Sequence, residues 1–140
     1  NFDFASPSLE KDSSLRDYMP YPFIYSQMPD VIACSDVVLS RAGANSIWEC
    51  SALSKPMILV PLTGSGTRGD QEDNARFFEK SGAALVLSGK DATSENLRKA
   101  LENLLLEENR KNMSFASGKL SEGVKPAEKI AEILYNEANS

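Results

Sequence analysis

Histidine is absent from this sequence of 140 residues. Its absence removes a histidine general base, a Ser-His-Asp triad and the commonest protein ligand for metal ions. The two cysteines, Cys34 and Cys50, form no CxxC pair, so we expect two reduced thiols that are buried as small hydrophobic side chains. Neither a metal site nor a cofactor is therefore predicted within this chain.

Positive charge is also in short supply, because 15 Lys and Arg residues stand against 20 Asp and Glu residues, for a net charge of -5. Nucleic acid is not an expected partner, since phosphate contacts dominate that kind of binding and require a basic surface. No apolar run is long enough to cross a bilayer and no signal-peptide pattern begins the chain, so neither a transmembrane segment nor a leader is predicted. The first residue is Asn1 rather than Met, as in a fragment or a processed product.

Apolar runs suited to buried strands alternate with helical patterns along most of the chain. Such alternation predicts an α/β fold in which helices flank an open, Rossmann-like parallel sheet. Residues 1–20 look irregular, so the domain is predicted to span residues 21–140. Strands are expected at 36–40, 56–62 and 83–87, and helices at 28–34, 44–53 and 70–80, followed by one helix capped by Ser94 and another opened by Pro126.

Ligands of open parallel sheets bind at the carboxyl ends of the strands, and the first loop at that edge covers residues 40–46. Small residues around Gly43 let a ligand approach the backbone, and the first N–H groups of the following helix favour an anion such as a diphosphate. Glu49 could accept hydrogen bonds from both hydroxyls of a ribose, but Ser46-Ile47-Trp48-Glu49 also matches a capping box. Arg41 is either a phosphate partner or a solvated surface charge.

Glycines dominate the second loop, where Gly64, Gly66 and Gly69 spell G-x-G-x-x-G between a strand and a helix. With Asp91 about 20 residues further on, the pattern resembles a dinucleotide fingerprint. The expected helix, however, begins after the last glycine and opens with acidic residues, which would repel a pyrophosphate. A flexible loop is therefore favoured over a dinucleotide cradle.

The helix after this loop begins with Asp70 and Gln71. A carboxylate beside an amide can bracket neighbouring sugar hydroxyls, because together they accept and donate hydrogen bonds. The structural alternative is that Asp70 caps the helix and Gln71 is simply exposed. Further along, leucines at 97, 101, 104 and 105 form one helical stripe, which we expect to pack on the sheet rather than to bind a partner protein.

These segments together resemble the C-terminal domain of MurG-type enzymes, the UDP-N-acetylglucosamine transferases that complete lipid II in bacterial peptidoglycan synthesis. The resemblance implies a GT-B fold, in which two Rossmann-like domains enclose the active site and residues 21–140 form the UDP-sugar-binding domain. The acceptor domain, which supplies the proposed catalytic base, is missing, so no catalytic residue is expected here. The matching stretches are 35–49, 55–61, 68–71, 74–75 and 78–84.

The resemblance also implies a role for individual residues in binding UDP-N-acetylglucosamine. Glu49 matches the acid that holds the ribose hydroxyls, and Asp70 with Gln71 matches the pair that reads the hydroxyls of the sugar. Gly43 and Ala44 match the helix start that faces the diphosphate. The donor-binding residues implied in this way are Tyr25, Arg41, Gly43, Ala44, Asn45, Glu49, Asp70 and Gln71.

Tyr25 in this set falls where the family's backbone contacts uracil, although the surrounding sequence diverges. The family's Gly-Gly-Ser phosphate loop is absent. The implied reaction is an inverting, metal-free transfer to a lipid-linked acceptor at the cytoplasmic face of the membrane, and the isolated chain is expected to turn over nothing. The alternatives are the donor-binding subunit of the dolichol-pathway transferase and a dinucleotide-binding module that uses the glycine loop.

Overall fold

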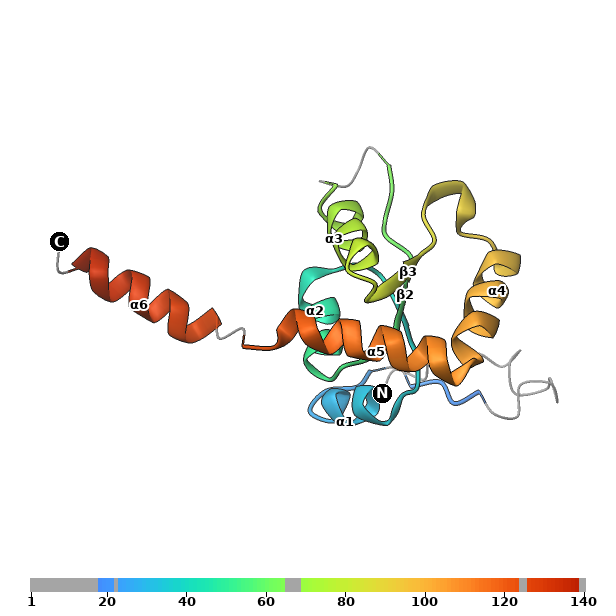
Figure 1. Ribbon diagram of the computed structural model, residues 1–140, viewed down its shortest axis with the longest axis horizontal. Helices are drawn as coiled ribbons and strands as arrows, with labels where there is room; N and C mark the ends of the chain where they lie inside the picture. Colours follow the sequence, from blue (N-terminus) through green and yellow to red (C-terminus); the bar gives the residue numbers. More distant parts are fainter. Residues whose placement is uncertain (1–17, 22, 65–68, 124–125, 139–140) are drawn as a thin grey trace, which may run out of the picture.

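The computed structural model describes residues 18–21, 23–64, 69–123 and 126–138. Within them one parallel sheet has the strand order β1-β2-β3 and helices on both of its faces, which confirms the predicted α/β class (Figure 1). The strands are β1 (Val38–Ser40), β2 (Met57–Leu59) and β3 (Ala84–Val86). The helices are α1 (Met28–Cys34), α2 (Ala44–Ala52), α3 (Asp70–Lys80), η2 (Gly89–Asp91, a 3-10 turn), α4 (Ser94–Leu105), α5 (Glu107–Ser121) and α6 (Pro126–Ala138).

The central strand β2 is buried on both faces, as the apolar run predicted. Met57 and Leu59 point into a core that α2 and α3 complete, whereas Ile58 points into a second core with residues of α4 and α5. The strands are shorter than expected because Pro56 and Pro61 flank β2 and have no N–H to donate to the ladder. The sheet is thereby held between two helical layers.

The carboxyl ends of the three strands lie at one edge of the sheet, because Ser40 pairs with Leu59 and Leu59 with Val86. α2 connects β1 to β2, and α3 connects β2 to β3. Both helices therefore begin at this edge, where ligands of parallel sheets bind.

Serine side chains join α5 to α2 on the flank of the sheet. Ser51 donates a hydrogen bond of 2.7 Å to the carbonyl oxygen of Ser117, and Ser121 donates one of 3.0 Å to the carbonyl oxygen of Ser51. Ser114 donates to the carbonyl oxygen of Ser54 at 2.6 Å, just beyond the end of α2. Small residues let the two helices approach closely, since a Cβ atom at Gly118 would collide with the Ser54 hydroxyl.

Helix α6 extends away from the body of the molecule, with Ile133 and Leu134 exposed on its surface (Figure 1). Its start at Pro126 is as predicted. Across the described ranges, no helix combines the length and the apolar character that a membrane span requires.

Several sequence-based expectations about side chains were wrong in whole or in part. Cys34 is exposed although Cys50 is buried, because only the latter lies on the face of its helix that packs on the core. Thr93, not Ser94, caps α4 and accepts a hydrogen bond of 3.2 Å from the N–H of Asn96. The expectation that the leucine stripe packs on the sheet was right for Leu104 and Leu97, which lie in the core around Ile58, and wrong for Leu101 and Leu105, which are exposed.

Two helices end in the same Schellman geometry, with the following residue in the left-handed region. Gly82 follows the C-cap of α3 with φ 73°, and the Ala83 N–H donates to the carbonyl oxygen of Phe78 at 2.9 Å. Ser54 ends α2 at φ 53°, and Lys55 donates to the carbonyl oxygen of Cys50 at 2.9 Å. Glycine adopts a positive φ without strain because it has no Cβ atom, whereas serine is strained in this conformation.

We expect Ser54→Gly to raise the free energy of unfolding by about 1 kcal/mol, because glycine adopts a positive φ without the clash of a Cβ atom. The reverse change at the equivalent position, Gly82→Ser, should lower it by about the same amount. Urea unfolding of both variants beside the unchanged chain measures the two effects. Changes of the same sign in both variants would contradict this account.

Candidate functional site

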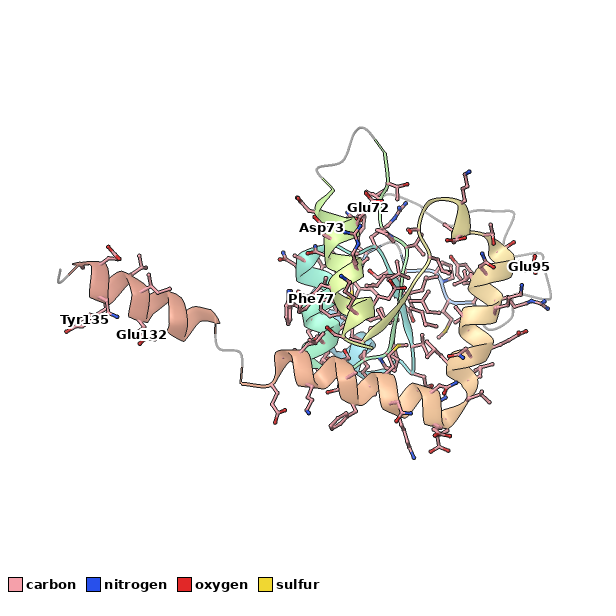
Figure 2. The ribbon with its side chains drawn as sticks, turned by 45° about the horizontal axis from the view of Figure 1, so that its top comes forward. Glu72, Asp73, Phe77, Glu95, Glu132 and Tyr135 are labelled. Atoms are coloured by element: carbon pink, nitrogen blue, oxygen red, sulfur yellow. The ribbon has the colours of Figure 1, made fainter. Side chains whose placement is uncertain are left out.

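The edge of the sheet at which α2 and α3 begin carries most of the predicted site residues. Arg41 lies in the turn between β1 and α2, and Asn45 lies in the first turn of α2; both are exposed. Glu72 and Asp73 lie near the beginning of α3, and Phe77 lies further along that helix (Figure 2).

Helix α2 begins without a side-chain cap. Gly43 is its N-cap, in the extended conformation at φ -69° and ψ 133°, so neither an unusual backbone conformation nor internal packing requires glycine here. A Cβ atom added to Gly43 would meet none of the described residues within 4 Å. The first N–H groups of α2 are therefore next to open space, in the arrangement that binds anions.

The capping-box interpretation of Ser46 and Glu49 is wrong. Ser46 is the third residue of α2 rather than its N-cap, since the helix already begins at Ala44. Glu49 lies two positions beyond the first turn and is exposed. Among the described residues, its carboxylate forms no hydrogen bond and no ion pair, so both oxygens are available to a ligand.

Helix α3 is capped by Gly69 in the left-handed conformation at φ 78°, and not by Asp70. Asp70 is instead the first helical residue, and its carboxylate is exposed. The first turn also contains Glu72 and Asp73, so its negative charge would repel a pyrophosphate. The helix begins after the last glycine of the G-x-G-x-x-G pattern, as expected, while Gly66 and Arg68 lie outside the described residues.

Gln71 is not simply exposed. It is half-buried, and its side-chain oxygen accepts a hydrogen bond of 3.0 Å from the N–H of Leu62, in the loop that follows β2. The bond occupies the acceptor end of the amide and leaves the NH2 group as a donor. Gln71 can therefore offer hydrogen-bond donors to a hydroxyl beside Asp70, which offers acceptors.

Asn74, one turn further along α3, connects that helix to the first loop. Its amide nitrogen donates a hydrogen bond of 3.1 Å to the carbonyl oxygen of Ala42, the residue before Gly43. Sequence reasoning included Asn74 only as part of the family resemblance and assigned it no role. The one local feature that could have indicated a role is that asparagine, a residue of low helix propensity, lies in the middle of a helix.

Tyr25 comes from a different part of the chain than the other predicted residues. It precedes α1, and its carbonyl oxygen accepts a hydrogen bond of 3.1 Å from Met28, while its exposed ring stacks on Phe23. The other end of α1 lies near the beginnings of the strands, where Lys55, ahead of β2, donates hydrogen bonds to the carbonyl oxygens of Ala33 and Ser35. Among the described residues, the contacts of Tyr25 are with Met28 and Phe23 rather than with the residues of α2 and α3.

Among the described residues at this edge, the start of α3 carries the negative charges of Asp70, Glu72 and Asp73, and the turn before α2 carries the positive charge of Arg41. Burial raises the pKa of the Cys50 thiol above its ordinary value, and the charge of neighbouring Glu49 raises it further. Cys50 is therefore a neutral core residue rather than a nucleophile. In the part of the chain that the structure describes, no three His, Cys, Asp or Glu side chains gather in a way that could hold a metal ion.

A groove lies elsewhere, between the end of α2 and α5, where Ser54 and Ser114 are among the lining residues. Its lysines already have partners, since Lys111 pairs with Glu107 at 2.6 Å and Lys119 lies 5.3 Å from the centre of the Phe115 ring. It faces the end of α2 that is remote from Gly43. We therefore place the candidate site at the starts of α2 and α3.

Comparison with protein families places nearly the whole chain in one of them. The model of the glycosyltransferase family 28 C-terminal domain matches residues 1–132. The UDP-N-acetylglucosamine–N-acetylmuramyl-(pentapeptide) pyrophosphoryl-undecaprenol N-acetylglucosamine transferase of Treponema denticola is 48% identical over 125 residues, which cover 85% of this chain and 32% of the relative. The transferase of the same name from Geobacillus thermodenitrificans is 46% identical over 107 residues, covering 73% of this chain and 30% of the relative. The chain thus spans about a third of the length of the curated relatives it matches.

Among solved structures, a spinosyn forosaminyltransferase, SpnP, has the same fold. The TM-score is 0.65 at 18% sequence identity, and the similarity covers 86% of this chain and 32% of SpnP. The names of the relatives are those of the MurG-type enzyme indicated by the sequence resemblance, and not of a dolichol-pathway subunit.

We expect Gln71→Ala to accelerate hydrogen exchange at the Leu62 amide about fivefold, the equivalent of a hydrogen bond of about 1 kcal/mol. Gln71→Glu should leave that exchange slow, because a carboxylate oxygen also accepts. Exchange followed by NMR at the single amide measures both variants. Equal exchange in Gln71→Ala and the unchanged chain would show that the bond is not formed in solution.

Proposed function

Since this chain belongs to the glycosyltransferase family 28 C-terminal domains, we propose that it binds UDP-N-acetylglucosamine at the starts of α2 and α3. It forms the donor-binding part of an enzyme that transfers N-acetylglucosamine to lipid I in peptidoglycan synthesis. The observation that carries the proposal is the uncapped start of α2, which faces open space at Gly43 in a chain of this family.

The diphosphate of the donor lies at the start of α2. The N–H groups of Ala44 and Asn45 point out of the first turn and are not used by a side-chain cap, and the helix dipole adds a partial positive charge. Arg41, exposed in the preceding turn, is placed to add a full positive charge. The absent side chain of Gly43 leaves room for the phosphate oxygens.

Polar side chains on either side of the diphosphate bind the two ends of the donor, the ribose and the sugar. The unpaired Glu49 carboxylate accepts hydrogen bonds from the ribose hydroxyls. Asp70 and the free NH2 group of Gln71 accept from and donate to the hydroxyls of the sugar. Tyr25 remains the predicted uracil contact.

The reaction we propose is a direct displacement. An acceptor hydroxyl attacks the anomeric carbon as UDP leaves, with inversion of configuration, and the start of α2 stabilises the charge that develops on the diphosphate. This chain contributes no general base, since it has no histidine and its carboxylates at the site are assigned to binding. The remainder of the enzyme supplies the base, binds the lipid-linked acceptor and contacts the cytoplasmic face of the membrane.

A titration of the 15N-labelled chain with UDP-N-acetylglucosamine, followed by NMR, tests the donor site directly. We expect shifts at the amides of the first turns of α2 and α3. Glu49→Ala should weaken binding about tenfold or more, because a charged acceptor for two hydroxyls is lost. Glu102→Ala is the matched control, since Glu102 is an exposed helical carboxylate on α4.

A parallel titration with NAD separates this function from the dinucleotide alternative. Shifts caused by NAD and confined to the glycine loop would move the site there and refute the proposal. An equal loss of UDP-N-acetylglucosamine affinity in Glu49→Ala and Glu102→Ala would remove Glu49 from the ribose site.

The isolated chain should transfer no sugar. A radiolabelled donor incubated with a lipid I analogue measures turnover, and the expected result is no product above the level without protein, because the acceptor-binding half and its base are absent. Product formation by these 140 residues would show that a base acts within them.

A further inference from the structure

Asn74 joins two segments that are distant in sequence but lie next to each other in the candidate site. Its half-buried amide donates to the carbonyl oxygen of Ala42 at 3.1 Å, across 32 positions in the chain. Ala42 is completely buried, so its carbonyl group belongs to a part of the backbone where an unpaired acceptor is costly. Among the described residues, Asn74 provides the hydrogen-bond donor to this carbonyl.

The orientation of the Ala42 carbonyl determines the orientation of the next N–H group. A peptide unit is planar, so the hydrogen bond to Ala42 also sets the direction of the Gly43 N–H. Gly43 in turn begins α2 through the bond of 3.1 Å between its carbonyl oxygen and the N–H of Ile47. The Asn74 amide therefore controls how the backbone enters the first turn of α2.

Gln71 makes an equivalent connection one turn earlier in α3. Its side-chain oxygen binds the N–H of Leu62, in the loop after β2. Together the two amides tie the start of α3 to the loops that follow β1 and β2. Helix α3 thereby holds both the loop proposed to bind the diphosphate and the residues proposed to bind the sugar.

We propose that Asn74 is a positioning residue that orients the Ala42–Gly43 peptide for the donor diphosphate, an inference that rests on the proposed function. Asn74 acts through the backbone of the first loop. The bond needs a donor, which an aspartate at this position does not provide when it is ionised. An aspartate would also set a negative charge against the Ala42 carbonyl oxygen.

The test compares Asn74→Asp with a matched change elsewhere. Asn109 also donates from its amide to a backbone carbonyl, that of Asn103 at 3.2 Å, on the α4–α5 side of the fold. Asn109→Asp thus removes a similar bond remote from the site. For each variant, NMR records the amide shifts of Gly43 and Ala44 without ligand, and titrations give the affinities for UDP and for uridine.

We expect Asn74→Asp to weaken UDP binding about tenfold while changing uridine binding little, and to shift the free Gly43 and Ala44 amides. Asn109→Asp should leave all of these values as they are. A role limited to stability would lower the affinities for UDP and uridine by the same factor, and that result would overturn the inference. So would unchanged UDP affinity in Asn74→Asp.

The ligand-free spectra keep this inference separate from the proposed function. If the unchanged chain does not bind UDP while Asn74→Asp still shifts the Gly43 and Ala44 amides, the donor site fails but the orienting role of Asn74 stands. If those amides do not move in Asn74→Asp, the inference is refuted whatever the chain binds.

Discussion

Burial of β2 on both of its faces is the constraint on which the arrangement of this domain depends. Met57, Ile58 and Leu59 have no exposed surface, and each side of the strand needs its own helical layer to exclude water. The pairing with β1 and β3 is parallel, so both crossovers contain a helix and both helices begin at the same edge. The candidate site follows from this alignment, because no single loop of the chain contains all of its groups.

Two helix starts with opposite chemistry meet at that edge. α2 begins with a glycine and uncommitted N–H groups, which suits an anion, whereas α3 begins with three acidic residues in its first turn, which suits hydroxyl groups. A nucleotide sugar has a charged centre and neutral, hydroxyl-rich ends, and it would use both surfaces. The amides of Gln71 and Asn74 hold the two starts in a defined relation.

Local patterns were sufficient to predict the type and order of the elements between residues 28 and 87, whereas η2 and α5 were not predicted. Helix α3 has the predicted bounds Asp70–Lys80, because an amphipathic period followed by glycine at the C′ position is a property of neighbouring residues. The strands were predicted too long, since their ends depend on pairing partners and on prolines. The caps of α2, α3 and α4 were each misassigned by one to three positions, because Ser, Thr and Asp side chains satisfy the cap pattern at several adjacent places.

The sequence by itself was enough to predict the parallel α/β class, which follows from periodicity, and the family, which the resemblance of adjacent motifs indicated. Only the tertiary structure determines which polar side-chain atoms of the candidate site form hydrogen bonds within the protein and which do not. The Gln71 oxygen is committed to Leu62 and the Asn74 amide to Ala42, while the Glu49 carboxylate is left open. Those outcomes depend on distances between segments 9 and 32 positions apart, and such distances exist only once the two cores have brought the strands and helices together.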